Sequence, residues 1–207
     1  MAQLKPGHSI KPIDALQKLV EGNNRFLKGF DAPDSFKYQD AGMRESQHPY
    51  ACILGCADSR VSPEHTFDES HGNLFVTRIA GNIVTPEIIA SLEYGTSVLG
   101  ASVILVLGHT NCGAVHAAMD AWSTNARFEG KIETLIHSIQ PAVKQCEHHD
   151  HAVWMKQAVE QNVRLNVAKL KASEPILSSL IREGKLMIAG GIYQLETGKV
   201  EILSDPQ

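Results

Sequence analysis

The apolar residues of this chain follow two different spacings, and each spacing predicts a different kind of element. Short, nearly continuous apolar runs bounded by glycine or polar residues predict strands that are buried on both faces of a sheet. The expected strands are 50–55, 74–80, 101–107, 185–189, 192–195 and 200–203. The last two flank the sequence Glu-Thr-Gly-Lys, which predicts a terminal hairpin.

Apolar residues at helical spacing fill most of the remaining sequence. The expected helices are 12–28, 85–99, 113–122, 131–146, 151–172 and a shorter one that ends near Gly184. The first helix is amphipathic, and Thr85-Pro86 has the pattern of an N-cap followed by proline at the first helical position. The polar residues 29–49 are expected to form a long connection. Strands that alternate with helices predict an α/β fold with a mostly parallel central β-sheet, an antiparallel edge strand and flanking helices.

Length, charge and cysteine content exclude several classes of protein. The chain has 207 residues and no linker-like change in composition, so a single domain over 1–207 is expected. Its net charge is −4 and its 19 basic residues are scattered, which argues against a nucleic-acid-binding surface. No apolar stretch reaches the length of a membrane span, and residues 1–11 have no signal-peptide core. The four cysteines do not suggest a disulfide scaffold, so reduced thiols and a cytoplasmic location are expected.

Two short polar segments follow the predicted strands 50–55 and 101–107. The first begins at Cys56, and the second begins at His109 and ends at Cys112. Because ligands bind beyond the carboxyl ends of the strands in open α/β sheets, both segments are expected at one edge of the sheet. Cysteine and histidine are the ligands that zinc prefers, and three protein ligands with one open position are typical of a catalytic site. The sequence therefore predicts zinc bound by these three residues, with Cys112 near a helix N-terminus that stabilises its thiolate.

A carboxylate and a guanidinium follow the first predicted ligand at alternate positions. In the run Cys56-Ala-Asp58-Ser-Arg60, Asp58 could accept a hydrogen bond from hydroxide on the metal, and Arg60 could hold that carboxylate through a bidentate pair. This arrangement would generate a nucleophile near neutral pH. Three other interpretations are a thiol phosphatase, a structural zinc site with Asp58 as a fourth ligand, and a surface ion pair. The phosphatase would need a longer phosphate-binding loop between cysteine and arginine, and Asp58 would repel phosphate there.

These motifs resemble those of the β-class carbonic anhydrases. Both signatures of that family are complete, Cys-x-Asp-Ser-Arg-Val at 56–61 and His-x-x-Cys-Gly at 109–113. The similarity continues through Phe75-Val-x-Arg, Gly81-Asn82-Ile-Val, Glu93-Tyr94 and Gly191-Ile-Tyr193. The resemblance implies a zinc enzyme, with one zinc ion per subunit, that interconverts carbon dioxide and bicarbonate.

The resemblance also implies a substrate cleft that two subunits share. Gln47, Phe75 and Tyr94 would line it, partly from the neighbouring subunit, and the backbone amide of Gly113 would help to hold bicarbonate. The protein would then be a homodimer or a dimer of dimers, with helix 12–28 packed on the partner. Two rival functions remain open on the same scaffold. One is hydrolysis of carbonyl sulfide or carbon disulfide, and the other is a non-catalytic zinc-binding sensor of inorganic carbon.

Overall fold

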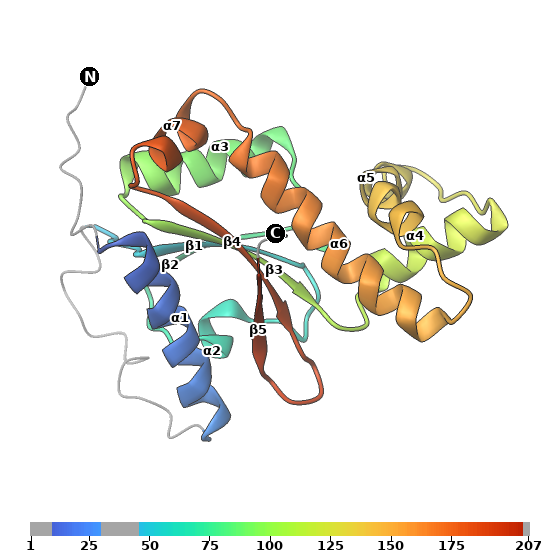
Figure 1. The fold of residues 1–207 in the computed structure, drawn as a ribbon, viewed down its shortest axis with the longest axis horizontal. Coiled ribbons are helices and arrows are strands. Elements are labelled where there is room, and N and C mark those ends of the chain that lie inside the picture. The colour runs from blue at the N-terminus through green and yellow to red at the C-terminus, as the bar shows by residue number, and fades with distance from the viewer. Residues whose placement is uncertain (1–9, 30–45, 205–207) are drawn as a thin grey trace.

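A five-stranded sheet forms the centre of the computed structural model, which describes residues 10–29 and 46–204 (Figure 1). The strands are β1 (Ala51–Gly55), β2 (Leu74–Arg78), β3 (Val103–His109), β4 (Met187–Tyr193) and β5 (Val200–Leu203). They lie in the order β2-β1-β3-β4-β5, and only the last pair, β4 with β5, is antiparallel. The predicted fold class is therefore confirmed.

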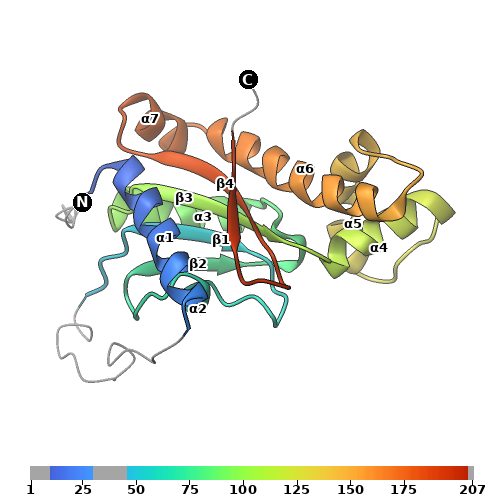
Figure 2. The ribbon, with the colours of Figure 1, turned by 60° about the horizontal axis from the view of Figure 1, so that its bottom comes forward.

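Helices cover both faces of this sheet. They are α1 (Pro12–Leu27), α2 (Pro63–Thr66), α3 (Pro86–Glu93), α4 (Gly113–Thr124), α5 (Ile132–Gln145), α6 (His151–Lys171) and α7 (Ile176–Arg182). Figure 1 shows α3 and α7 on one side of the sheet and α1 and α2 on the other. Figure 2 shows that α4 and α5 lie beyond the end of the sheet toward which β3 runs. Among the described residues, no helix combines the length and the apolar character needed to cross a bilayer.

The central strands contribute side chains to two separate hydrophobic cores, one on each face of the sheet. Every residue of β1 and β3 is buried, which explains why these segments are apolar without alternation. Ile104 and Val106 pack with α4, α5 and α6, whereas Val103 and Leu105 pack with the face that carries α1. Because successive side chains of a strand point to opposite faces, one apolar strand can serve both layers. The register brings the ends of β1 and β3 to the same edge of the sheet, with Gly55 opposite Leu107.

Four predicted elements need correction, and one short helix was not predicted. The segments 185–189 and 192–195 are a single strand, β4, which runs through Gly190 and Gly191 and forms the terminal hairpin with β5. The expected helix 85–99 is α-helical only to Glu93 and continues as a π-helix, η4 (Tyr94–Val98). The strand expected over 74–80 ends at Arg78, and the one-turn helix α2 was not predicted. The N-cap was predicted correctly, since Thr85 Oγ1 accepts a hydrogen bond from Ile88 N.

Helix α1 packs its buried face on the sheet of its own chain. Ala15 and Leu19 are fully buried there, and Asn23 bonds to the backbone at Thr66 and Gly198. Near the N-terminus of the helix, Ile13 is 56% exposed. The expected packing of α1 on a partner subunit stays a prediction, and residues 30–45 of the expected connection 29–49 lie outside the described residues.

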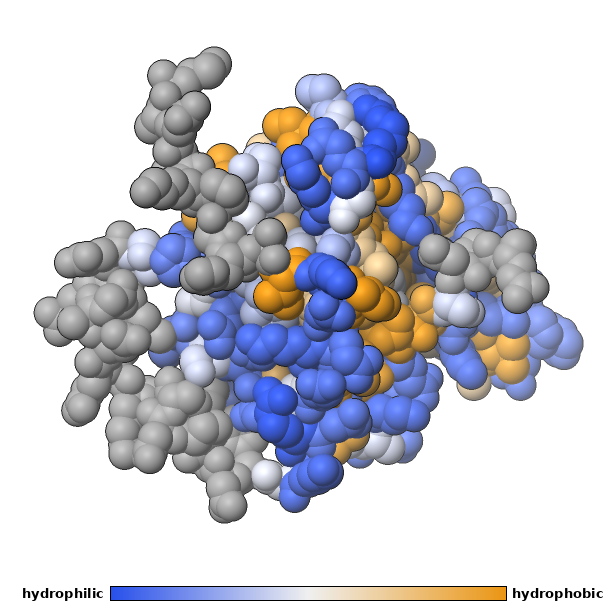
Figure 3. All heavy atoms as spheres, turned by 60° about the vertical axis from the view of Figure 1, so that its left-hand side comes forward, coloured by the Kyte–Doolittle hydropathy of each residue, from blue (hydrophilic) through white to orange (hydrophobic). Residues whose placement is uncertain are grey.

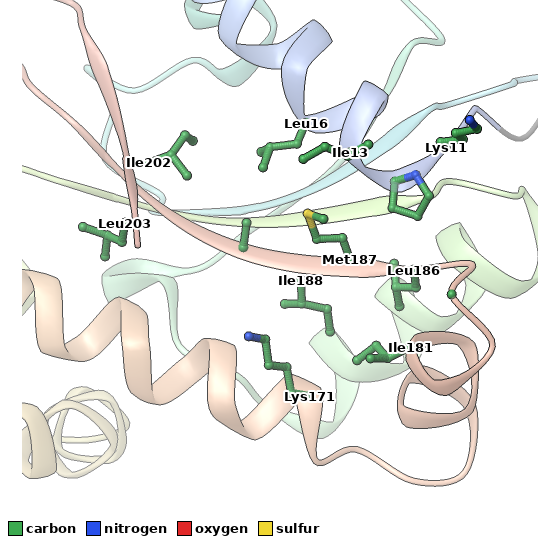
Figure 4. A pocket seen from close by; sticks show the side chains of 13 residues that line it. Lys11, Ile13, Leu16, Lys171, Ile181, Leu186, Met187, Ile188, Ile202 and Leu203 are labelled. Carbon is green, nitrogen blue, oxygen red and sulfur yellow. The ribbon is translucent and has the colours of Figure 1, made fainter. Parts of the chain in front are cut away.

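An apolar groove of about 660 Å³ lies between α1 and the edge of the sheet at β4 and β5 (Figure 4). Ile13 and Leu16 line it from α1, and Met187 and Ile202 line it from the strands. Figure 3 shows apolar surface gathered between hydrophilic areas on one face of the molecule. Ile13 and Leu16 of α1 therefore adjoin apolar residues of the sheet in this groove.

Candidate active site

The three predicted metal ligands converge at the edge of the sheet where β1 and β3 end. Cys56 directly follows β1, His109 is the last residue of β3, and Cys112 is the N-cap residue of α4. All three side chains are buried, and their ligand atoms lie within 4.8 Å of one another. Asn111, with a φ of 53°, lets the chain turn sharply enough for His109 and Cys112 to face the same point.

The donor atoms of this cluster suit a zinc ion. The carbonyl oxygen of Thr110 accepts a hydrogen bond from Nδ1 of His109 at 2.9 Å, which leaves the Nε2 lone pair of that ring available. Among the described residues, the buried Nε2 has no hydrogen-bond partner, and its lone pair could coordinate a metal ion. The sulfur atoms of Cys56 and Cys112 are 3.9 Å apart. Two thiolates at 2.3 Å from a tetrahedral zinc would be about 3.8 Å apart, so the spacing fits.

The sulfur atoms also have the electrostatic character of a cation site. A hydrogen bond from the Cys112 thiol lowers the pKa of Cys56 to about 4, and the hydrogen bond from the Gly81 N–H acts in the same direction, against the cost of burial. Donation of that bond, together with burial, raises the pKa of Cys112. Of the two sulfurs, Cys56 therefore favours the thiolate form, which provides negative charge for a cation, and Cys112 favours the protonated form. A divalent cation would displace the remaining proton.

Asp58 and Arg60 form a rigid pair beside the ligands. Arg60 Nε donates to Asp58 Oδ1 at 2.9 Å, Nη2 donates to Oδ2 at 2.7 Å, and the backbone N–H of Arg60 donates to Oδ1 at 3.0 Å. The Arg60 side chain holds the pKa of the Asp58 carboxyl well below its usual range. Asp58 Oδ2 lies 3.7 Å from His109 Nε2, so an ionised and oriented carboxylate faces the ligand cluster.

Several groups that hold this site were not identified as functional from the sequence. Arg78 Nε donates to the carbonyl oxygen of Cys56 at 2.9 Å, and Arg78 Nη2 donates to that of Asp58 at 2.6 Å. The N–H of Gly81 donates to Cys56 Sγ at 3.3 Å. Both residues belong to sequence patterns shared with the family, but the residue types alone give no sign of these bonds.

Of the four predicted substrate-binding residues, one lies beside the ligands of its own chain and three do not. Gly113, the first residue of α4, is next to Cys112 and is exposed. Phe75 and Tyr94 contact each other, with ring centroids 6.2 Å apart, but Phe75 pairs with Cys52 near the start of the parallel strands. Gln47 is exposed and precedes β1, so it also belongs to that end of the sheet. Within one chain, these three residues and the metal ligands thus lie at opposite ends of the strands.

A cavity of about 1060 Å³ opens beside the turn that joins His109 to Cys112. Asn111 and Gly113 line one part of it, and His116 and His151 line another, with their ring centroids 5.3 Å apart. The cavity gives solvent and small molecules access to the N-terminus of α4.

Comparison with known proteins identifies the family. A family model described as carbonic anhydrase matches residues 51–200. Carbonic anhydrase 2 of Mycobacterium tuberculosis is 36% identical over 189 residues, which cover 91% of each chain. The carbonic anhydrase of Mycolicibacterium smegmatis is 31% identical and covers 93% of this chain and 94% of its own.

Solved structures agree with this result. The Coccomyxa β-carbonic anhydrase in complex with acetazolamide superposes with a TM-score of 0.72 at 32% identity, and the match covers 93% of this chain and 87% of that one. A tetrameric β-carbonic anhydrase from Sordaria macrospora has the same fold, with a TM-score of 0.71 at 22% identity over 93% of this chain and 98% of its own. The chain therefore belongs to the carbonic anhydrase family, in its β class.

Proposed function

We propose that this chain uses one zinc ion per subunit, held by Cys56, His109 and Cys112, to interconvert carbon dioxide and bicarbonate. The observation that carries the proposal is the convergence of two buried thiols on a buried imidazole nitrogen that has no hydrogen-bond partner within the described chain. Membership of the carbonic anhydrase family gives the reaction. A zinc ion at this point would supply the Lewis acidity that lets water ionise near neutral pH.

The side chains beside the ligands orient the reacting water. Asp58 Oδ2 accepts a hydrogen bond from Arg60 and lies near His109 Nε2. It can therefore also accept a hydrogen bond from a water molecule near that nitrogen and fix the direction in which the lone pair of the water points. The guanidinium keeps the carboxylate ionised and aimed. Asp58 is therefore assigned to orient the nucleophile, and Arg60 to position Asp58.

The backbone at the start of α4 is assigned to bind bicarbonate, the anion of the reaction. The N–H of Gly113 lies in the first turn of a 12-residue helix, where unpaired N–H groups and the helix dipole favour an anion such as bicarbonate. Gln47, Phe75 and Tyr94 are assigned to the substrate cleft. Two aromatic rings suit carbon dioxide, which is small and nonpolar, and the Gln47 amide can donate to an oxygen of bicarbonate.

We infer that the cleft is completed by a second copy of the chain in a homodimer or a dimer of dimers. Phe75 and Tyr94 belong to one end of the strands and the ligands follow the other end, so one chain alone leaves the ligands without these rings. Tyr94 is 48% exposed, which is high for an aromatic ring that has no surface function. The exposed side of α1 at Ile13 is proposed to pack on the partner. Four free cysteines are compatible with a reducing compartment such as the cytoplasm.

Metal content and turnover, measured on the same preparations, test the function. The purified chain should contain about one zinc per subunit, and stopped-flow hydration of carbon dioxide should be lost when a chelator removes it. Cys112→Ser should lose both zinc and activity. Cys146→Ser is the matched control, because Cys146 is a half-buried thiol outside the metal cluster and should keep both. A metal-free preparation with full activity would refute the assignment.

The same preparations distinguish the rival functions. Turnover of carbonyl sulfide or carbon disulfide in place of carbon dioxide would identify a hydrolase. A zinc-loaded chain that binds bicarbonate without any turnover would identify a sensor.

A further inference from the structure

The backbone N–H of Gly81 is fixed against a proposed metal ligand. It donates to Cys56 Sγ at 3.3 Å from a residue whose φ of 73° is the left-handed conformation that favours glycine. A Cβ at this position would lie 2.5 Å from Ile139 Cδ1 and 3.3 Å from Ala114 Cβ. Helices α4 and α5 therefore close on the Cα of Gly81 and leave it little room to move.

Two buried asparagines of α6 hold the other side of the same turn. Asn162 Nδ2 donates to the carbonyl oxygen of Gly81 at 2.8 Å. Asn166 Nδ2 donates to the carbonyl oxygen of Asn162 at 2.8 Å, and Asn166 Oδ1 accepts from Val84 N at 2.9 Å. Both asparagines are almost completely buried. The mechanism proposed above assigns no role to either of them.

We propose that Asn162 is a positioning residue of the metal centre that acts through the Gly81 backbone. Asn162 anchors the carbonyl group on one side of the Gly81 Cα, and the N–H on the other side is thereby held toward Cys56 Sγ. Such a bond orients a ligating thiolate and offsets part of its charge, so its loss weakens the hold on the metal. This inference rests on the proposed function, since it requires a metal at Cys56.

The test compares two buried asparagines that differ in their connection to the site. Asn162→Leu keeps nearly the same side-chain size and removes the donor to Gly81. Asn23→Leu is the matched control, because Asn23 is equally buried and donates to two carbonyl groups, but it joins α1 to Thr66 and Gly198. The readouts are the rate at which zinc passes to a chelator and the sulfur-to-cobalt charge-transfer absorption of the cobalt-substituted protein.

Asn162→Leu should release zinc about tenfold faster than the wild type, in the range expected when a residue that supports a ligand is lost. Its charge-transfer band should move to lower energy, because the Cys56 thiolate loses a hydrogen-bond donor. Asn23→Leu should match the wild type in both measurements. If Asn162→Leu does not fold, Asn162→Ser, whose hydroxyl is too short to span the gap to Gly81, should show the same two changes.

Two results would overturn the inference, and they are distinguishable. Equal release rates and equal band positions in the Asn162 and Asn23 variants would show that Asn162 does not act on the metal centre. A wild-type chain that binds neither zinc nor cobalt would overturn the proposed function itself, and this inference with it.

Discussion

The hydrogen bonds of Asp58 decide what this carboxylate can do beside the ligands. Both of its oxygens are held by Arg60, at 2.9 and 2.7 Å, and Oδ2 is also 3.7 Å from His109 Nε2. A carboxylate that is held in this way accepts hydrogen bonds in a fixed direction, and it would have to break its pair with Arg60 to bind a metal itself. The pair therefore favours a centre with an open coordination position.

Asp58→Asn should keep zinc and lose most of its turnover. The amide can donate as well as accept, and it pairs poorly with the Arg60 guanidinium, so the water near His109 is no longer oriented. We expect a loss of about a hundredfold in the hydration rate, as for the removal of a positioned proton acceptor. Zinc content and stopped-flow hydration, measured on one preparation, check this. Unchanged turnover in the zinc-loaded variant would mean that the pair has only a structural role.

At the scale of residues, the sequence predicts side chains with distinctive chemistry better than backbone groups. Cys56, His109 and Cys112 were predicted to be metal ligands because cysteine and histidine at strand ends have few other common uses, and the structure brings them together. The contribution of Gly81 is an N–H group, and every residue except proline has one. From the sequence alone, Asn162 could be predicted only to lie in a helix. The fold alone reveals that its amide reaches Gly81.

At the scale of elements, the prediction failed where glycine serves packing. The predicted strands 185–189 and 192–195 leave out Gly190 and Gly191, yet both glycines lie within β4. A Cβ on Gly190 would lie 2.7 Å from a Val163 methyl group, so the glycine allows α6 to approach the sheet closely. The π-helix η4 also contains a glycine, Gly95, that is in close tertiary contact. A Cβ on Gly95 would lie 2.5 Å from Cys52 Sγ, and the apolar spacing of this segment does not predict that distortion.

Strand β1 contains a thiol whose burial should make the stability of the protein depend on pH. Burial raises the pKa of Cys52 from 9.0 to about 12. Above pH 9.0, the unfolded chain loses this proton while the folded chain keeps it, so ionisation stabilises the unfolded state. The contribution of Cys52 to stability is therefore complete below pH 9.0 and declines as the pH rises toward 12.

Urea unfolding of the wild type and of Cys52→Ala at a series of pH values would measure this effect. From pH 9.0 upward, the free energy of unfolding should fall more steeply in the wild type, by up to about 1 kcal/mol per pH unit relative to the variant. The difference between the two slopes isolates Cys52 from the other groups that titrate in the same range, including tyrosine and lysine side chains. Parallel slopes would contradict the prediction.

At the scale of the whole molecule, the main question is where the rings of Phe75 and Tyr94 lie relative to the metal ligands. The fold class followed from the sequence because buried strands and amphipathic helices have clear patterns. The sequence could not show which end of the strands Phe75 and Tyr94 occupy relative to the ligands. The register answers this for one chain, since Phe75 lies opposite Cys52 and Arg78 lies opposite Gly55. A site that needs both ends of the sheet must use two chains.

Mixing two inactive variants tests that conclusion directly. One variant is Cys112→Ser, which removes a metal ligand, and the other combines Gln47→Ala with Tyr94→Ala, which damages the cleft. In a hybrid dimer with shared sites, one site carries both defects and the other carries none. After the two variants are unfolded together and refolded with zinc, random pairing should restore about a quarter of the wild-type activity, since half of the dimers are hybrids with one intact site.

The control for this experiment mixes Cys112→Ser with Cys56→Ser. Both substitutions affect the ligand set, which comes from a single chain, so each site in every pairing lacks a ligand and no activity should return. If each chain instead formed a complete site alone, the hybrid of the ligand and cleft variants would contain one defect in each site. Its activity would then stay at the level of the separate variants, and the shared cleft would be refuted. Recovery in the first mixture and not in the second would establish that Gln47 and Tyr94 serve the metal centre of the neighbouring subunit.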